Sequence, residues 1–343
     1  MDARAENAIT LAGKETAGPG MNGKRTIDFV IPAYNEADNI DAMVARIVKA
    51  FEAIGVTSFK ILFVENGSSD NSAALLAAHA AKDPRVVGIS LSRNFGPQGA
   101  IHAGLSHSDA DYVCVLDGDQ QDPPEDAANM FKLMQEEGAD VVYAVRRKRE
   151  EKALRKAGFK TFYRVWRLFS YVEVPLDAGE FAVMRRSVVD AILSSPEIHR
   201  FNRGLRSWVG FRQIPYQHDR PNRVAGEQKF NIVKDTVLGL QAVLSFSLLP
   251  IRLILVFGFM LAGVSFAILA VNALAILLNA FGHSGLFNLL PRGIITLNLI
   301  QLLFQGVMFI AVGVIGEYVG RIYEQAKARP TFITKKIIGS LDA

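Results

Sequence analysis

Two long stretches without a charged side chain constrain this chain more than any other feature of its sequence. No Asp, Glu, Lys or Arg occurs from Leu253 to Phe281 or from Ile294 to Ile315. About 20 apolar residues in an α-helix span the roughly 30 Å hydrocarbon core of a bilayer. Buried core helices are the competing interpretation, but uncharged runs of this length are rare in soluble folds. We therefore predict transmembrane helices over residues 251–281 and 294–316.

Basic residues on either side of these stretches predict the orientation of the chain in the membrane. Before the first stretch and after the second stand Lys229, Lys234, Arg252, Arg321, Lys327, Arg329, Lys335 and Lys336. Because Lys and Arg accumulate in cytoplasmic segments, we expect a multi-pass protein of the cell membrane whose soluble part and both termini are cytoplasmic. Residues 1–24 lack the apolar core of a signal peptide and are predicted to form a disordered tail. Residues 317–343 are predicted to form a cytoplasmic tail.

The overall charge is nearly balanced. The chain has 38 Lys and Arg against 34 Asp and Glu, so nucleic acid is not an expected partner. A membrane surface or a phosphorylated ligand suits so small a basic excess better. The one cysteine, Cys114, cannot form an intrachain disulfide, and its apolar surroundings are typical of a packed core residue.

The soluble part alternates short β-branched runs with helical patterns. The predicted strands are 27–31, 61–65, 86–91, 112–116 and 141–145, and the predicted helices are 39–54, 72–82, 98–106 and 124–137. This alternation predicts an α/β fold with a mostly parallel sheet and helices on both faces. Ligands bind such folds at the carboxyl ends of the strands. The segments expected there are Pro32–Glu36, Glu65–Asp70, Ser92–Gly96 and Asp117–Asp122.

Two further segments have the spacing of amphipathic helices. Residues 151–170 interleave basic and aromatic side chains, among them Arg155, Phe159 and Trp166. Such a helix can lie in the headgroup layer of a membrane, or it can pack its aromatic side chains on a protein core. Residues 231–250 lead into the first uncharged stretch and are predicted to form a juxtamembrane amphipathic helix.

Acidic and amide side chains follow the predicted strand at 112–116. The segment reads Asp117-Gly118-Asp119-Gln120-Gln121-Asp122. Carboxylate and amide oxygens that converge at a strand end suit a hard divalent cation that also binds phosphate oxygens. Taken alone, an Asp-x-Asp pair is a weak signal, because it also occurs in many solvated turns. The neighbouring motifs decide between these interpretations.

Several motifs, taken together with this segment, resemble one enzyme family. In chain order they are Val30-Ile31-Pro32-Ala33-Tyr34-Asn35-Glu36, Val64-Glu65-Asn66-Gly67-Ser68-Ser69-Asp70, Ser92-Arg93-Asn94-Phe95-Gly96, Asp122-Pro123-Pro124-Glu125, Leu176-Asp177-Ala178-Gly179-Glu180-Phe181, Arg223-Val224-Ala225-Gly226-Glu227-Gln228-Lys229-Phe230 and Gly316-Glu317-Tyr318-Val319-Gly320-Arg321-Ile322-Tyr323-Glu324. They resemble the inverting GT-A glycosyltransferases, and among these the dolichyl-phosphate mannose synthase and polyisoprenyl-phosphate glycosyltransferase branch. The resemblance runs from about residue 27 to residue 333. It implies a GT-A catalytic domain over residues 25–230 that transfers a sugar from a nucleotide-sugar donor, with a UDP-sugar favoured, to a polyprenyl phosphate.

The resemblance also implies roles for single residues on the donor side. The nucleotide base and ribose would be held by Pro32, Tyr34, Glu36, Glu65 and Ser68. A Mg²⁺ or Mn²⁺ ion would sit on Asp119 and Gln121, with Asp117 nearby toward the ribose or the ion. The family usually shows two aspartates where this chain has Glu65 and Asn66, so its base or ribose contacts are expected to differ. Two smaller departures, Gln120 and Gln228, remove no predicted metal ligand.

On the acceptor side the implied residues are mostly basic. Arg146 and Arg155 match positions that hold the lipid phosphate, and Arg223 and Lys229 match a mobile loop that closes over the diphosphate. Each has a plainer interpretation, since Arg146 stands in a charged run typical of a solvated face and the loop residues could neutralise membrane phosphates. Asp177 and Glu180 could orient the acceptor or serve the turn at Gly179.

Polar side chains inside the uncharged stretches predict how the two helices pack. They are Asn272 and Asn279 in the first, and Asn298, Gln301 and Gln305 in the second. Amide side chains that pair across a hairpin satisfy one another in lipid, so we predict a two-helix transmembrane hairpin. Alternatively, these residues face a neighbouring protomer of a homo-oligomer or line the path of the lipid chain.

Two other functions share part of these patterns. A processive polysaccharide synthase has the first motifs, but this sequence contains no Gln-x-x-Arg-Trp and only two predicted spans. A membrane scaffold that binds a nucleotide sugar without transferring it is the other alternative, suggested by Glu65 and Asn66. The favoured prediction is a metal-dependent transferase that makes a polyprenyl-linked sugar, a glycolipid of the cell envelope.

Overall fold

The computed structural model describes residues 25–146, 178–219 and 294–341, together with isolated residues between 254 and 281. The chain forms two compact units. The first comprises Met1–Tyr163, Val172–Ile232 and Ala328–Ala343, and the second comprises Arg164–Tyr171 and Val233–Lys327. The segments predicted as an N-terminal tail, an interfacial helix and a juxtamembrane helix lie outside the described residues.

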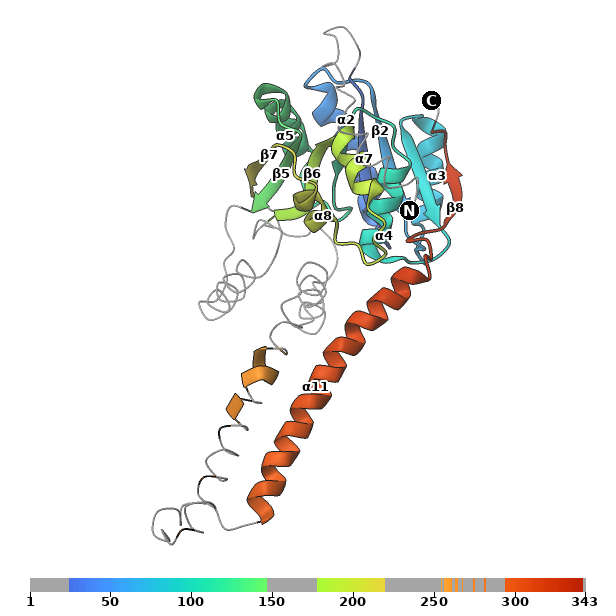
Figure 1. The fold of residues 1–343 in the computed structure, drawn as a ribbon. Helices are drawn as coiled ribbons and strands as arrows, with labels where there is room; N and C mark the ends of the chain where they lie inside the picture. Colours follow the sequence, from blue (N-terminus) through green and yellow to red (C-terminus); the bar gives the residue numbers. More distant parts are fainter. Residues whose placement is uncertain are drawn as a thin grey trace, which may run out of the picture. The chain divides into compact units, whose positions relative to one another are not determined.

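Apolar, largely β-branched runs form the central strands of one eight-stranded sheet (Figure 1). The strands are β1 Ile27–Ala33, β2 Phe59–Glu65, β3 Val86–Leu91, β4 Tyr112–Val115, β5 Val141–Arg146, β6 Ala178–Arg185, β7 Gln213–His218 and β8 Thr334–Ile338. Their spatial order is β7-β5-β6-β4-β1-β2-β3-β8. Neighbours among β1 to β4 pair in parallel, as do β5 and β7, whereas β6 and β8 are antiparallel to their neighbours. The predicted α/β fold with a mostly parallel sheet is confirmed.

Helices cover both faces of this sheet. The core on one face contains Phe29 and Phe63 and is covered by α2 (Ala37–Glu52), α3 (Ser72–Lys82) and α5 (Pro124–Glu137). The core on the other face contains Val30 and Leu62 and is covered by α4 (Gly96–Ser106) and α7 (Arg186–Ser194). Because successive side chains of a strand point to opposite faces, β1 and β2 supply both cores, which explains why they read as continuous apolar runs.

The elements predicted between residues 27 and 145 are confirmed, with shifts of a few residues at some ends. β3, α3 and α5 have the predicted bounds. The strands β6, β7 and β8, and the helices α7 and α8 (Asn202–Trp208), have no counterpart among the predicted elements.

The last strand, β8, comes from the segment expected to be a cytoplasmic tail. It pairs antiparallel with β3, with Ile338 opposite Gly88. A Cβ added at Gly88 would lie 3.1 Å from Cβ of Ile338, so the glycine permits this close approach. Lys335 and Lys336, which stand in the strand, suit an exposed edge because charged side chains oppose pairing with another chain. The end of the chain therefore completes the sheet beyond β3.

Residues 331–333, just before β8, contact the segment that connects β3 to α4 and α4 itself. The backbone N–H of Ser92 donates to the carbonyl of Ile333 at 2.9 Å. On α4, Nδ1 of His102 lies 2.5 Å from Oγ1 of Thr331, and the His102 ring meets Phe332 edge-on with 5.3 Å between centroids. The C-terminal segment therefore contacts the chain just before residues 93–96, at Ser92, and again after them, at His102.

His102 makes the stability of this contact depend on pH. Burial lowers the pKa of His102 to about 4, and the charge of Arg200 adds to the effect. An unfolded histidine titrates near pH 6.5, so the unfolded state binds more protons and folding stability falls as the pH drops from about 6.5 toward 4. Replacing His102 with Phe, which keeps a ring beside Phe332, is expected to reduce this acid-side loss. Melting temperatures of both proteins in detergent between about pH 8 and pH 5 check this, and parallel curves would contradict it.

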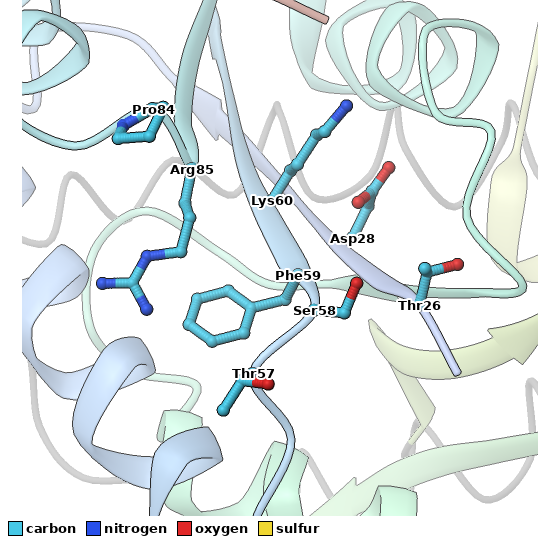
Figure 2. A pocket seen from close by; sticks show the side chains of 8 residues that line it. All are labelled: Thr26, Asp28, Thr57, Ser58, Phe59, Lys60, Pro84 and Arg85. Atoms are coloured by element: carbon cyan, nitrogen blue, oxygen red, sulfur yellow. The ribbon is translucent and has the colours of Figure 1, made fainter. Parts of the chain in front are cut away.

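A pocket of about 200 Å³ opens at the edge of the sheet where β1 and β2 begin (Figure 2). Its lining residues are Thr26, Asp28, Thr57, Ser58, Phe59, Lys60, Pro84 and Arg85. The charged groups already have protein partners. Lys60 donates to the carbonyl of Leu341, Asp28 accepts from Ser108 at 2.7 Å, and Arg85 pairs with acidic side chains. Of these contacts, the one made by Lys60 connects the pocket to the C-terminal segment.

Among the described residues, one helix is long and apolar enough to cross a membrane. It is α11 (Ile294–Ala326), in which Phe304–Ala326 meets this criterion. Several of its described apolar side chains are exposed, among them Phe309 at 77%. The helix predicted over 294–316 is present and continues to Ala326, and a pair one turn apart, Arg321 donating to Glu317 at 3.0 Å, supports the extension. The first predicted span is described only at isolated residues, so the two-helix hairpin stays a prediction.

Candidate functional site

The segments that follow β1, β2, β3 and β4 meet at one edge of the sheet. Because these strands are parallel, their carboxyl ends lie on the same side. The segments also bond to one another, since the N–H of Asn66 donates to the carbonyl of Ala33 at 2.9 Å and the N–H of Asn35 to Oγ of Ser68 at 3.1 Å. We call residues 32–36, 65–70, 92–96 and 117–122 together the motif edge.

Asp70 fixes two helices to the motif edge. One carboxylate oxygen accepts the N–H of Ala37 at 3.1 Å, at the start of α2, and the other accepts the N–H of Ser72 at 3.0 Å, at the start of α3. Burial by itself would raise the pKa of Asp70, but the hydrogen bonds from Ser72 and Ala37 lower it overall. A carboxylate is also favoured at helix N-termini, so Asp70 is ionised at neutral pH and holds this part of the site rigid.

The residues predicted to hold the nucleotide lie together at the motif edge, but in different environments. Tyr34 is 48% exposed. Glu65 is 4% exposed, and its carboxylate accepts hydrogen bonds from Oγ of Ser90 at 2.7 Å and from the N–H of Ser68. The described contacts of Glu65 therefore hold the loop after β2 against β3.

Asn66, one of the departures from the family pattern, joins the second and third motif segments. Its amide nitrogen donates to the carbonyl of Gly96 at 3.1 Å, and its amide oxygen accepts the N–H of Phe95 at 2.9 Å. An aspartate could make only the second of these bonds, because an ionised carboxylate has no donor. Gly67 follows with φ 71 and packs so closely that an added Cβ would lie 2.7 Å from backbone atoms of Arg93 and Asn94. The loop therefore requires the amide group of Asn66, which both donates and accepts, and a glycine at position 67, where a side chain would not fit.

The acidic segment after β4 is held by its own backbone. Asp119 is 6% exposed, and its Oδ1 accepts the N–H of Gln121 at 3.1 Å. Oδ2 of Asp122 accepts the N–H of Asp117 at 3.2 Å. These bonds gather the predicted metal ligands, Asp119 and Gln121, and Asp117 into one tight turn.

Gln120, another departure, turns away from its acidic neighbours. It adopts φ 61 and is 8% exposed. Its amide nitrogen donates to Oδ1 of Asn39 at 2.9 Å, and its amide oxygen accepts from Arg46 at 3.5 Å. Arg46 in turn pairs with Glu125 at 2.7 Å. Gln120 therefore anchors the acidic segment to α2 and leaves the predicted ligands unchanged.

The donor atoms of this segment fit a divalent cation that shares its coordination with phosphate. Within residues 25–146, 178–219 and the described part of 254–341, no cluster of three or more His, Cys, Asp or Glu side chains forms a metal cage. Mg²⁺ is typically held by one or two carboxylates while water and substrate phosphates complete its shell. Asp119, Asp117 and the amide oxygen of Gln121 match that pattern, because they offer hard oxygen atoms without a complete cage.

The predicted basic residues are only partly described. Arg146 ends β5, where it stands opposite His218 in parallel register, and this end of β5 lies on the same side of the sheet as the motif edge. Its side chain is outside the described residues, as are Arg155, Asp177, Arg223 and Lys229. The roles of these residues in holding phosphate stay predictions.

A polar network next to the motif edge joins Glu180, which the sequence suggested as a residue that orients the acceptor, to two residues that were not predicted, Gln98 and Asn202. Gln98, near the start of α4, bonds both to Glu180 on β6 and to Asn202 on α8. These three residues are far apart in the sequence, so no local pattern connects them. In the sequence, the feature that could have suggested a functional role for Gln98 is its position two residues after the Ser92–Gly96 motif.

Known glycosyltransferases are similar to this chain over most of its length. The family model described as glycosyl transferase family 2 matches residues 28–193. An uncharacterized glycosyltransferase, YkcC of Bacillus subtilis (strain 168), is 38% identical over 91% of this chain and 94% of its own length. A prophage bactoprenol glucosyl transferase homolog of Escherichia coli (strain K12) is 34% identical over 91% of this chain and 99% of its own.

A third relative extends the range of sugars. The undecaprenyl-phosphate 4-deoxy-4-formamido-L-arabinose transferase of Klebsiella pneumoniae (strain 342) is 32% identical over 92% of this chain and 94% of its own length. These alignments extend well beyond the family model, whose match ends at residue 193. The chain, with its parallel sheet and its motif edge, belongs to glycosyl transferase family 2.

Proposed function

We propose that this protein transfers one sugar from a nucleotide diphosphate donor, with a UDP-sugar favoured, to a polyprenyl phosphate in the cytoplasmic leaflet of the cell membrane. The transfer inverts the anomeric carbon. The observation that carries this proposal is that a single chain holds both the motif edge and the apolar helix α11. Relatives named for bactoprenol and undecaprenyl phosphate support the choice of acceptor, because they align with nearly the whole chain.

On the donor side, the chain's own residues bind and orient the nucleotide sugar. Tyr34 offers an exposed ring for the base, and the rigid loops after β1 and β2 set the position of the ribose. Asp119 and Gln121, with Asp117 beside them, would hold Mg²⁺ or Mn²⁺. When bound, such an ion neutralises the diphosphate and makes it a better leaving group.

On the acceptor side, the chemistry asks for positive charge more than for a strong base. A phosphate monoester has a second pKa near 6, so the acceptor is largely ionised at neutral pH and its oxygen can attack without losing a proton to the enzyme. Two phosphate groups must come close despite their repulsion. Arg146, Arg155, Arg223 and Lys229 are the residues proposed to hold them, and the anomeric carbon is attacked from the face opposite the leaving group.

Transfer of radioactivity from labelled nucleotide sugars into chloroform-extractable lipid tests this proposal. Purified protein is incubated with polyprenyl phosphate and a panel of UDP- and GDP-sugars. We expect label in the lipid fraction with at least one donor. Label in a water-soluble or insoluble polymer would favour the processive synthase, and binding of a nucleotide sugar without transfer would favour the scaffold.

A further inference from the structure

Gln98 links three elements at the motif edge through its side-chain amide. Its nitrogen donates to Oε1 of Glu180 at 2.9 Å, and its oxygen accepts the backbone N–H of Asn202 at 2.7 Å. A backbone N–H can only donate, so the amide oxygen of Gln98 must face Asn202. The orientation of the amide is therefore fixed, and its nitrogen is left for Glu180.

The strand register places Glu180 at the same edge of the sheet as Asp117. β6 runs antiparallel to β4, with Ala182 opposite Val115. Residues that precede Ala182 therefore lie at the same edge as residues that follow Val115, which include Asp117. Ala178 stands opposite Val145 of β5, which confirms that the start of β6 reaches this edge.

A buried arginine stabilises Glu180 from within the protein. Arg206 of α8 is 3% exposed, and it donates to the carbonyl of Gly179 at 3.1 Å. Burial lowers the pKa of Arg206 to about 10, while the negative charge of Glu180 and the nearby Tyr143 act in the opposite direction. The guanidinium thus remains charged at neutral pH, fixes the backbone next to Glu180 and balances its carboxylate.

The carboxylate of Glu180 is held on one side and available on the other. Glu180 is partly exposed, and within the described part of the chain its Oε2 accepts no hydrogen bond. An acceptor-only group at a site that binds two phosphates would repel both of them. The part of the substrates that complements it is a donor of hydrogen bonds. Because the base and the ribose are proposed to lie at the loops after β1 and β2, the donors that remain are the hydroxyl groups of the transferred sugar.

Resting on the proposed function, we propose that Glu180 accepts a hydrogen bond from a hydroxyl of the transferred sugar, and that Gln98 is the positioning residue that holds its carboxylate in place. Glu180 then helps to select the sugar, whereas Gln98 contacts no substrate. The selectivity arises because bound substrate shields Glu180 from water, and a shielded carboxylate oxygen left without a hydrogen bond is costly. A donor that lacks the hydroxyl in question is therefore transferred more slowly.

The first experiment compares Gln98→Ala with wild type in the lipid-transfer assay. We expect kcat/KM for the nucleotide sugar to fall about tenfold to a hundredfold, the usual range for a lost hydrogen bond to a charged group. Affinity for the free nucleoside diphosphate, measured by calorimetry, stays within about twofold because that ligand lacks the transferred sugar. The matched control is Gln213→Ala, since Gln213 donates only to the carbonyls of Arg206 and Gly210 at the other end of α8. It is expected to keep wild-type kinetics.

A second variant, Gln98→Glu, separates positioning from simple loss of structure. Its new carboxylate still accepts the N–H of Asn202 but faces Glu180, so the two carboxylates must share a proton. Arg206 interacts with Glu180 and with the neighbouring Arg203 and Tyr143, and Asp117 follows the strand β4 at the same edge of the sheet. We expect the ratio of variant to wild-type activity to rise as the pH falls from about 8 to about 6, whereas Gln98→Ala shows no such rise.

The third comparison identifies the contact itself. Donors that lack single sugar hydroxyls are tested with wild type and with Glu180→Gln. One deoxy donor should lose at least about tenfold in kcat/KM with wild type and distinctly less with the variant. Wild-type kinetics and pH dependence in both Gln98 variants, or equal losses for every deoxy donor in both proteins, would overturn the inference. If wild type itself transfers no sugar from any donor, the proposed function fails and the inference with it.

Discussion

Replacing Asp119 with Asn is expected to lower the rate of sugar transfer by about 10²- to 10³-fold while the protein stays folded. The substitution keeps an Oδ1 atom that can accept the N–H of Gln121, so the turn after β4 is preserved. The substitution removes one negative charge that would bind the divalent cation required by the proposed function. Initial rates over a Mg²⁺ titration measure the effect, and we expect half-saturation to shift to higher Mg²⁺ concentration as well.

The control for Asp119→Asn is Asp122→Asn in the same turn. Asp122 is also buried and accepts a backbone N–H, that of Asp117, at 3.2 Å. It is not among the predicted metal ligands, so its variant should retain far more activity and an unchanged Mg²⁺ requirement. Wild-type transfer by Asp119→Asn, or equal losses in the two variants, would contradict the assignment of Asp119.

Deleting the chain from Thr331 onward is expected to abolish cooperative unfolding of the catalytic domain and, with it, transfer. The deletion removes β8, exposes the edge of β3 and takes away the hydrogen bond from Ser92 to Ile333. It also exposes to solvent the apolar side chains against which Phe332, Ile337 and Ile338 pack. Together these losses amount to several kcal/mol, a large share of the roughly 5–15 kcal/mol that stabilises a domain.

Two variants make this prediction specific. Ile338→Asp changes one side chain, which is 8% exposed, and places a charge against β3, so it should lower the melting temperature in the same direction. Deletion of Asp342 and Ala343 alone leaves β8 complete and should change neither melting nor transfer. A protein truncated at Thr331 that melts and transfers like wild type would show that β8 is dispensable.

The central strands could be predicted because each is a local pattern. β1 to β5 are apolar runs bounded by turn residues, and β3 was located to the residue. β1 extends two residues beyond its predicted end, through Pro32, because the carbonyl of Ala33 accepts the N–H of Asn66 from the next strand's loop. Pro32 has no backbone N–H to donate, and a local pattern does not show that the strand continues through it toward a partner elsewhere in the chain.

The edge strands could not be predicted because their pairing is non-local. β8 contains two lysines and follows an apolar helix, so its sequence was interpreted as a basic flank of a membrane span. Its partner β3 lies in the first third of the chain. β7 contains a proline and few apolar residues, which weakens its strand signal.

The candidate site was predictable in position but not in its internal contacts. Parallel strands bring their carboxyl ends together, so the four motif segments had to meet. Sequence could not reveal that the Glu65 carboxylate is taken by Ser90 and Ser68, because such bonds depend on side-chain geometry. Nor could it reveal that Gln98 holds Glu180, which stands 82 positions away in the sequence.

Mass spectrometry of the lipid product tests the central claim most directly. Purified protein is supplied with a synthetic polyprenyl phosphate of defined length and the best donor from the panel. The lipid is then extracted and its molecular mass is measured. The account predicts a single new species whose mass exceeds that of the acceptor by one sugar residue, with its phosphate retained. Species with several sugars on one lipid, a sugar polymer free of lipid, or an unchanged acceptor after full consumption of donor would contradict it.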